Sequence, residues 1–274
     1  MSHLHSTPLS DLPLVFIDLE TTGLNPQFGH RICEVAMLRE RAGREEGQLD
    51  ALLNPGRPLD PKAAAVNGLN DAQLANAPPF ASVAPSVVEL STAAVAVGHN
   101  LAFDLAFLNH ELVALGQPRL NEPSLDTLIL ARRLLRCQSY NLTALCSELG
   151  LLRPSHRAMA DVLAMRALFH HLRELMAAQG ITTLTAALRF ERGLRPDDPE
   201  PEPPPLIAAA LATQRPLRII YSSRSTPEPT ARIIYPHYLT QERNGTYLRA
   251  FCELRQDVRT FALAKIQHME LLEG

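Results

Sequence analysis

Apolar residues gather in short runs in the first third of the chain, and later they recur at intervals of three and four residues. The short runs predict strands, and the intervals predict helices. Four strands are expected at 14–19, 32–38, 48–53 and 93–97, and four helices at 103–115, 125–135, 142–149 and 160–178. Gly116, Gly150 and Gly180 are typical helix stops. Strands followed by helices indicate an α/β architecture, in which helices pack over a mixed sheet.

A run of prolines and acids from Arg195 to Pro205 interrupts this pattern, and its composition predicts an extended connector. We therefore divide the chain into 1–195, a linker at 196–205, and 206–274. After the linker, a short helix is expected at 206–213 and strands at 217–221, 231–235, 246–253, 259–263 and 266–272. These short strands and the turn signal Asn244-Gly245 predict a small β-barrel or β-roll.

The composition excludes some classes of protein. With 274 residues, 46% of them hydrophobic, the chain can bury a full core. No apolar run is long enough to cross a membrane and no signal peptide is evident, so we expect a cytoplasmic protein without a membrane partner. Four scattered cysteines predict neither a zinc site nor a disulfide framework. The net charge of −3 is not the strongly basic signature of nucleic-acid binding, but residues 206–274 alone carry 9 basic and 6 acidic residues.

Two carboxylates stand at the end of the first predicted strand. Asp18 and Glu20 are two positions apart, so both point to the same face of the strand and can hold the same cation. A lone Asp-x-Glu pair is common in proteins. Its place at the end of a buried strand favours a metal site, because adjacent buried carboxylates are unfavourable unless a cation neutralises them.

Two further segments carry chemistry. Asp104 follows another apolar strand and opens a helix, where an aspartate either ligates a metal or simply favours the positive end of the helix. His156 precedes Asp161 in the first turn of the last long helix, and taken alone such a histidine is more often a surface residue. Each segment is ambiguous by itself.

Together the three segments supply four carboxylates and one imidazole. Oxygen ligands of this kind select Mg²⁺ or Mn²⁺ over zinc, and four acids can hold two such ions. Two ions can bind a phosphodiester and activate water, while a neutral histidine takes the proton of that water. The residues therefore predict hydrolysis of a phosphodiester.

The same segments resemble the three exonuclease motifs of the DnaQ-like (DEDDh) family. The motifs read Asp18-x-Glu20-Thr-Thr-Gly-Leu24, His99-Asn-x-x-Phe-Asp104 and His156-x-Ala-x-x-Asp161, with Asp126-Thr-Leu128 between the last two. The resemblance covers about residues 14–176. It implies a ribonuclease-H-like fold and 3'-to-5' hydrolysis that releases nucleoside 5'-monophosphates.

The resemblance also implies roles for individual residues. Four acids would be the metal ligands and His156 the general base. A further set would contact the terminal nucleotide, with Leu24 against its base. The implied ligands are Asp18, Glu20, Asp104 and Asp161, and the implied substrate contacts are Thr21, Thr22, Gly23, Leu24, His99, Asn100 and Phe103. The chain departs from many relatives at Val66-Asn67-Gly68-Leu69, where they carry His-Gly-Ile, which puts in doubt any substrate contact made by that histidine.

The last third of the chain resembles a WYL domain, a small Sm/SH3-like barrel. The resemblance rests on Arg232-Ile-Ile-Tyr-Pro-His-Tyr-Leu, Gly245-Thr-Tyr-Leu-Arg-Ala-Phe-Cys252 and Arg259-Thr-Phe-Ala-Leu-Ala-Lys-Ile266. It implies binding of nucleic acid or a nucleotide ligand, although Thr246 replaces the tryptophan for which the family is named and Lys265 stands where arginine is usual. Candidates for stacking and phosphate contact are Tyr221, Arg232, Tyr247, Arg249 and Arg259. Alternating strands would produce much of the same pattern for structural reasons.

The expected function is that of a metal-dependent 3'-to-5' exonuclease acting on single-stranded or frayed DNA ends. An exoribonuclease of the same family is an alternative, because the two substrates differ only by a 2'-hydroxyl. A second alternative is an inactive nuclease scaffold that serves a WYL-type regulator. All five catalytic positions are filled, which favours an active enzyme. The sequence does not identify protein partners.

Overall fold

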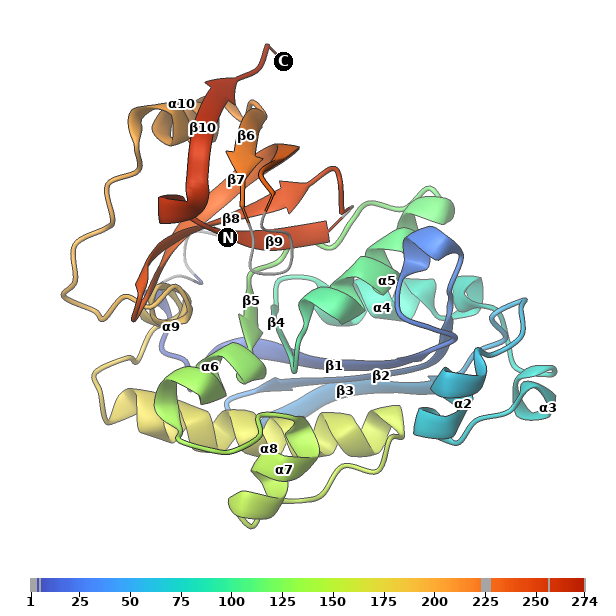
Figure 1. Cartoon of the computed structure of the whole chain (residues 1–274). Coiled ribbons are helices and arrows are strands. Elements are labelled where there is room, and N and C mark those ends of the chain that lie inside the picture. Colours follow the sequence, from blue (N-terminus) through green and yellow to red (C-terminus); the bar gives the residue numbers. More distant parts are fainter. Residues whose placement is uncertain (1–3, 5, 223–227, 256, 274) are drawn as a thin grey trace. The chain divides into compact units, whose positions relative to one another are not determined.

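The computed structural model describes residues 4, 6–222, 228–255 and 257–273 (Figure 1). The chain forms two compact units, Met1–Glu191 and Arg192–Gly274. The second unit therefore begins slightly before the linker that we place at 196–205. Helix α10 (Pro205–Thr213) begins at the last residue of that linker.

The first unit is built on a mixed five-stranded sheet in the order β3-β2-β1-β4-β5. Central strand β1 runs antiparallel to β2 and parallel to β4, and β4 runs parallel to β5. The strands are β1 (Pro13–Thr21), β2 (Ile32–Arg41), β3 (Arg44–Leu52), β4 (Val95–Gly98) and β5 (Ser124–Asp126). The mixed α/β architecture is confirmed.

Strand β5 was not predicted. The segment from Leu125 onward was expected to be helical, yet Leu125 pairs with Val97 of β4 and helix α6 begins only at Thr127. Asp126 ends the strand and caps the helix, since its side chain accepts a hydrogen bond from the Leu128 amide. A strand of three residues is too short to show the alternation of apolar and polar positions by which strands are recognised in a sequence.

The helices of the first unit lie mainly on the two faces of the sheet. Long helix α8 packs against β1 and β2, and α5 packs against β1 on the other face (Figure 1). Gly116, Gly150 and Gly180 adopt positive φ after α5, α7 and α8, as predicted. None of the described helices is long and apolar enough to span a membrane. The elements are α2 (Pro61–Asn67), α3 (Asp71–Leu74), α4 (Ala84–Ser91), α5 (Ala102–Ala114), α6 (Thr127–Leu134), α7 (Leu142–Glu148), α8 (Ala158–Ala177) and α9 (Leu184–Glu191), with 3-10 turns η1 (Pro26–Phe28) and η2 (Phe80–Ser82).

Two hydrophobic cores lie on opposite faces of β1. Phe16 belongs to the core on the α8 face, where its ring meets Phe169 edge-on at 5.8 Å between centroids. Val15 and Ile17 belong to the core on the α5 face, with Phe107. Because side chains alternate along a strand, this arrangement directs the even-numbered residues of β1, including Asp18 and Glu20, toward the α8 face.

The second unit contains α10 and an antiparallel five-stranded sheet in the order β10-β6-β7-β8-β9. The five predicted strands are present, although β7 is much longer than expected and the tight turn falls at Arg243-Asn244, one residue early. No pairing joins β9 to β10 among the described residues, so the structure shows a sheet, and closure into a barrel stays a prediction. The strands are β6 (Leu217–Tyr221), β7 (Thr230–Glu242), β8 (Gly245–Cys252), β9 (Asp257–Ala262) and β10 (Ile266–Leu271), with η3 (Leu263–Lys265) before the last.

Candidate active site

The predicted acids of β1 stand where its regular pairing ends. Asp18 and Glu20 are both half-buried on the α8 face, and the register between β1 and β2 shifts immediately after Glu20. Directly opposite Glu20 on β2 lies Glu34, whose side chain is fully buried. The end of β1 therefore brings three carboxylates together on one face of the sheet.

Two helices bring the other predicted acids to this strand. Asp104, in the first turn of α5, is only 5% exposed, and the backbone of Leu19, between the two acids of β1, partly offsets the rise in its pKa that burial causes. Asp161, in the first turn of α8, is 8% exposed. Its Oδ1 accepts hydrogen bonds from the backbone amides of Ser155 at 2.8 Å and His156 at 3.1 Å.

His156 lies on the loop that leads into α8, with an exposed side chain and a left-handed backbone at φ 58°. Glu20, His156 and Asp161 each offer a ligand atom within 4.8 Å of the other two. Asp18 and Asp104 stand outside this group of three, but each interacts electrostatically with members of it. The structure thus gathers all five predicted catalytic residues from β1, α5 and the start of α8.

The electrostatics of the cluster are those of carboxylates held close together, with Arg157 only partly offsetting the rise in the pKa of Glu20. Burial raises the pKa of Asp18 well above its usual value, and the charges of Asp104 and Asp161 raise it further. Burial raises the pKa of Glu20 to about 8, with Asp161 and Glu34 adding to the rise. Burial also raises the pKa of Asp104 and of Asp161. A hard divalent cation fits such a set, because it would neutralise the repulsion and accept oxygen ligands.

The turn after β1 is held rigidly. The Thr21 hydroxyl donates to the Gly23 carbonyl at 2.7 Å, and the Thr22 hydroxyl accepts from the Arg31 amide at 3.0 Å. A Cβ on Gly23 would lie 2.3 Å from the His30 ring, so any other residue there would require this ring to move. Both threonine side chains are thus occupied in shaping the turn, whereas Leu24 is 84% exposed and can meet a substrate.

The segment after β4 has a similar structural function. The His99 ring donates from Nε2 to the Tyr140 carbonyl at 2.9 Å and contacts the Thr127 hydroxyl through Nδ1 at 2.9 Å. Burial lowers the pKa of His99, which favours its neutral form. Asn100 is exposed with a left-handed backbone at φ 71°, and Phe103 packs on Phe107 at 5.0 Å between ring centroids. Their contacts with a nucleotide remain predictions.

Sequence reasoning missed the residues that support the cluster. Asp126 joins two motifs, because its Oδ1 accepts from the Asn100 amide at 3.0 Å as well as capping α6. Asn67 is 4% exposed, and its side chain acts to lower the pKa of Glu20 against the rise that burial causes. Glu34 pairs with Arg157. Glu34 could have been noticed in the sequence, because it is a charged residue inside the apolar run from Ile32 to Leu38.

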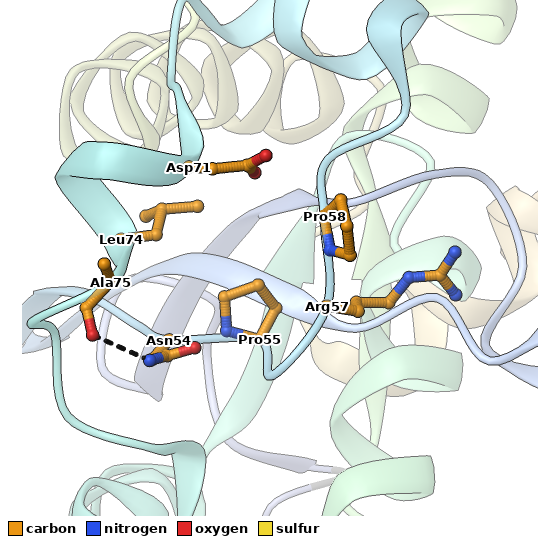
Figure 2. A pocket seen from close by; sticks show the side chains of 7 residues that line it. All are labelled: Asn54, Pro55, Arg57, Pro58, Asp71, Leu74 and Ala75. Carbon is orange, nitrogen blue, oxygen red and sulfur yellow. Dashed lines mark hydrogen bonds between the residues drawn. The ribbon is translucent and has the colours of Figure 1, made fainter.

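A separate pocket of about 320 Å³ lies beside α3 and shares no residue with the predicted site (Figure 2). Figure 2 shows Asn54 hydrogen-bonded to the Ala75 carbonyl on one side of it. The Asp71 carboxylate, its one acidic group, accepts a hydrogen bond from the Leu59 amide. The pocket therefore brings together no pair of acids that could hold a metal ion, and Arg57 is its one basic group.

In the second unit, the five predicted binding residues do not share one face. Arg232 pairs with Ile219 and is buried on the core face, where its guanidinium lies 5.8 Å from the Tyr221 ring centroid. Arg259 pairs with Ala250 and belongs to that same face. Tyr247 and Arg249 alternate with the buried Leu248 and therefore lie on the opposite face.

Comparison with known proteins identifies both parts of the chain. The protein-family model described as Exonuclease matches residues 15–169. The chain belongs to this exonuclease family. The family model described as WYL domain matches residues 205–271. The two resemblances seen in the sequence are confirmed.

Curated relatives carry names from DNA replication. A DNA polymerase III subunit epsilon-like protein of Rhodobacter capsulatus is 37% identical over 193 residues, which is 68% of this chain and 27% of that protein. The PolC-type DNA polymerase III of Thermotoga maritima is 31% identical over 64% of this chain and 13% of its own length. The chain thus spans about a quarter or less of these relatives.

Solved structures show the same fold. Exonuclease X in complex with 5' overhanging duplex DNA is 27% identical, with a TM-score of 0.50 over 64% of this chain and 97% of that one. A 3'-exonuclease that recognises the histone mRNA stem-loop has a TM-score of 0.50 over 64% of this chain and 68% of its own, at 16% identity, and supports the fold alone. The first unit has the predicted ribonuclease-H-like exonuclease fold.

Proposed function

We propose that this chain is a metal-dependent 3'-to-5' exonuclease that removes nucleoside 5'-monophosphates from DNA ends. The observation that carries the proposal is the cluster of Asp18, Glu20, Asp104 and Asp161 beside His156. Four acids with raised pKa values, gathered by three separate elements, are unfavourable for stability and are therefore a functional feature. Membership of the exonuclease family supports the reaction class.

The four acids would hold two Mg²⁺ or Mn²⁺ ions. When bound, these ions would polarise the phosphoryl oxygen and offset the negative charge that develops during hydrolysis. The protein places the ligands on regular elements, with Asp104 in the first turn of α5 and Asp161 fixed by two amides of the preceding loop. A set of oxygen donors favours these cations over softer metals.

His156 would act as the general base. Water attacks the terminal phosphorus, the bond from phosphorus to the 3' oxygen of the preceding nucleotide breaks, and the proton of the water passes to the imidazole. His156 lies close to both Glu20 and Asp161, which supports this role, because the ring is then beside the acids that would hold the ions. Its exposure leaves the ring open to the substrate.

We propose single-stranded or frayed DNA as the substrate. The DNA polymerase III names of the curated relatives and the DNA bound by exonuclease X favour DNA over RNA. The exposed Leu24, on its rigid turn, is suited to pack against the terminal base. RNA remains the second candidate, because a single group can distinguish the 2'-hydroxyl.

The second unit is proposed as a nucleic-acid or nucleotide-binding module. Its match to the WYL family supports this role, and the return of β10 to pair with β6 supports the closed Sm/SH3-like barrel that the resemblance implies. The core face, with Arg232, and the outer face, with Arg249, are two separate candidate binding surfaces. Protein partners remain unknown.

A gel assay tests the nuclease proposal. The protein is incubated with 5'-labelled single-stranded DNA or matching RNA, with Mg²⁺, Mn²⁺ or EDTA, alongside His156→Ala and Asp18→Ala, and His171→Ala as a matched control on α8. We expect a ladder that shortens from the 3' end, requires metal, persists in His171→Ala and is slowed by at least about a hundredfold in the other two variants. The ratio of DNA to RNA rates identifies the substrate. A lack of shortening under every metal condition would overturn the proposal.

A further inference from the structure

Two buried glutamates of β2 tie this strand to α8 at separate points. Glu34 and Glu40 are each 1% exposed, and both point to the α8 face, as do Ala36 and Leu38 between them. Glu34 pairs with Arg157, at the start of α8, with 2.8 Å between Nη2 and Oε1. Glu40 pairs with Arg166, farther along the helix, at 2.5 Å between Nε and Oε2. The two ion pairs have the same chemistry but only the first lies beside the candidate active site.

The first pair does more than join two side chains. Arg157 directs both Nε and Nη2 at Glu34, in the forked geometry that fixes orientation as well as distance. Glu34 also accepts a hydrogen bond from the backbone amide of Ala158 at 3.3 Å. Arg157 is the N-cap residue of α8 and its side chain caps nothing in its own helix. Glu34 therefore caps this helix from a strand 124 positions away in the chain.

His156 is the residue immediately before this anchored arginine. Its positive φ is uncommon for a non-glycine residue, and such a backbone persists only where the surroundings enforce it. The constraints are visible on both sides. The His156 amide donates to Asp161, and the next residue is held by Glu34. The ring itself is exposed, so backbone anchoring must supply much of its placement.

We propose that Glu34, acting through Arg157 and the amide of Ala158, is a positioning residue that holds His156 in its catalytic orientation. The inference rests on the proposed nuclease function and concerns the placement of its general base. The rival explanation is that Arg157, whose side chain is 51% exposed, contacts a substrate phosphate directly. The two explanations predict different kinetics.

A double-mutant cycle separates them. Arg157→Ala should lower kcat on single-stranded DNA by about 10- to 100-fold with little change in KM, because a small misplacement of a catalytic group has an effect of that size. In a His156→Ala background, the same substitution should cause no further loss, since the group it positions is gone. A direct phosphate contact would instead raise KM, reduce the salt dependence of binding, and lower activity equally in both backgrounds. Those results would overturn the proposal.

Two further variants test whether position or charge is responsible. Glu34→Gln removes a negative charge near Glu20 and weakens the anchor, because one side-chain oxygen is replaced by a donor. Arg157→Ala removes a positive charge and breaks the anchor. If the position of His156 is responsible, kcat falls in both variants. If the local charge is responsible, the Mg²⁺ concentration needed for half-maximal activity shifts in one direction in Glu34→Gln and in the other in Arg157→Ala. Arg157→Lys keeps the charge but loses the fork, so it should restore little activity if position matters. Arg166→Ala is the matched control and should leave kcat unchanged.

A readout independent of activity keeps the inference testable if the protein proves not to be a nuclease. The ring resonances that disappear in His156→Ala identify this histidine in an NMR spectrum. We expect them to move toward the positions of an unrestrained histidine in Arg157→Ala and to stay in place in Arg166→Ala. Unchanged His156 resonances in folded Arg157→Ala protein would overturn the proposal, whereas an inactive wild-type enzyme would overturn only the nuclease function.

Discussion

The half-buried acids at the end of β1 and the buried Glu40 near the end of β2 lie on the same face of one sheet, but they differ in their partners. Glu40 meets Arg166 and the Nε2 of His170 at 2.9 Å. Burial raises the pKa of Glu40, but these two partners outweigh it and leave that pKa below its usual value. At the end of β1, by contrast, burial and neighbouring carboxylates raise the pKa of Asp18 and Glu20.

This difference separates structural acids from chemical ones. A buried carboxylate with an arginine partner is satisfied by the protein itself, as Glu40 and also Glu111 are. A group of buried carboxylates without such partners is incomplete until a cation binds. None of the ion pairs found in the described part of the chain includes Asp18, Glu20, Asp104 or Asp161. The following predictions test this contrast.

The largest effect is expected for Asp18→Asn. It should reduce exonuclease activity by at least about a thousandfold, because an amide is a poor ligand for a hard cation whose charge stabilisation is worth several kcal/mol. The same variant should raise the thermal midpoint of the metal-free protein, since it removes one of the repelling charges. Activity and melting in EDTA are the measurements. A lower midpoint for Asp18→Asn than for the wild type in EDTA would show that Asp18 is a structural acid like Glu40.

Arg166→Ala should have the opposite pattern. It leaves Glu40 buried with only His170 as a partner, so the free energy of unfolding should fall by up to about 3 kcal/mol. Exonuclease activity at 25 °C should not change. Because the pKa of Glu40 is lowered in the folded state, its contribution is present at neutral pH and is lost as the pH falls through that lowered value. Urea unfolding at pH 7 and at pH 4 should therefore show a smaller penalty at the lower pH.

The distinction between the two kinds of acid was only partly predictable from the sequence. Asp18, Glu20, Asp104, His156 and Asp161 were predictable because each stands at the end of a strand or the start of a helix, within a family motif. The anchoring of His156 was not, because Glu34 and Arg157 are 123 positions apart and only the fold brings them together. Sequence patterns show which residue is charged inside an apolar run, but not which partner neutralises it.

The fold itself shows the same limit. Apolar periodicity located the long helices and the strands of both units, since burial of one face fixes those elements. It missed short β5, and it could not show that Arg232 and Arg249 belong to opposite faces, because that depends on register and on which face is buried. The contacts expected of Thr21 and Thr22 with a nucleotide stay predictions, and the hydrogen bonds by which their hydroxyls hold the turn depend on the fold.

Metal and pH should act together on stability. The pKa of Glu20 is raised from 4.5 to about 8, so folding favours its protonated form. This contribution is fully present below pH 4.5 and is lost as the pH rises through about 8. In EDTA, the thermal midpoint should therefore decline across this range, and Mg²⁺ should raise it more at pH 8 than at pH 5. An equal Mg²⁺ effect at both pH values would contradict the assignment of Glu20 as a ligand. Glu20→Gln should flatten the dependence.

The smallest effect is expected in the second unit, where the two arginines on opposite faces allow the same contrast between structure and function. Arg232 is 8% exposed, its guanidinium lies over the Tyr221 ring, and its Nε donates to the Thr230 hydroxyl at 3.2 Å. Arg232→Ala should therefore destabilise the unit by about 1–3 kcal/mol. Arg249 lies on the outer face and donates to the Thr260 hydroxyl at 3.1 Å. Arg249→Ala should change stability by no more than about 0.5 kcal/mol.

Binding then decides which face is functional. If the outer face binds nucleic acid, Arg249→Ala in the full chain should weaken the binding of single-stranded DNA by less than about tenfold. It should also reduce the slope of log K against log salt concentration by about one, because one phosphate contact is lost. Fluorescence anisotropy in EDTA measures this binding without hydrolysis, and Arg218→Ala, at an exposed position of β6, is a charge-matched control. Loss of binding in folded Arg232→Ala protein, with Arg249→Ala unaffected, would instead assign the ligand to the core face. In that case the buried Arg232 would be a functional residue. Burial beside a partner would then no longer distinguish structural residues from functional ones.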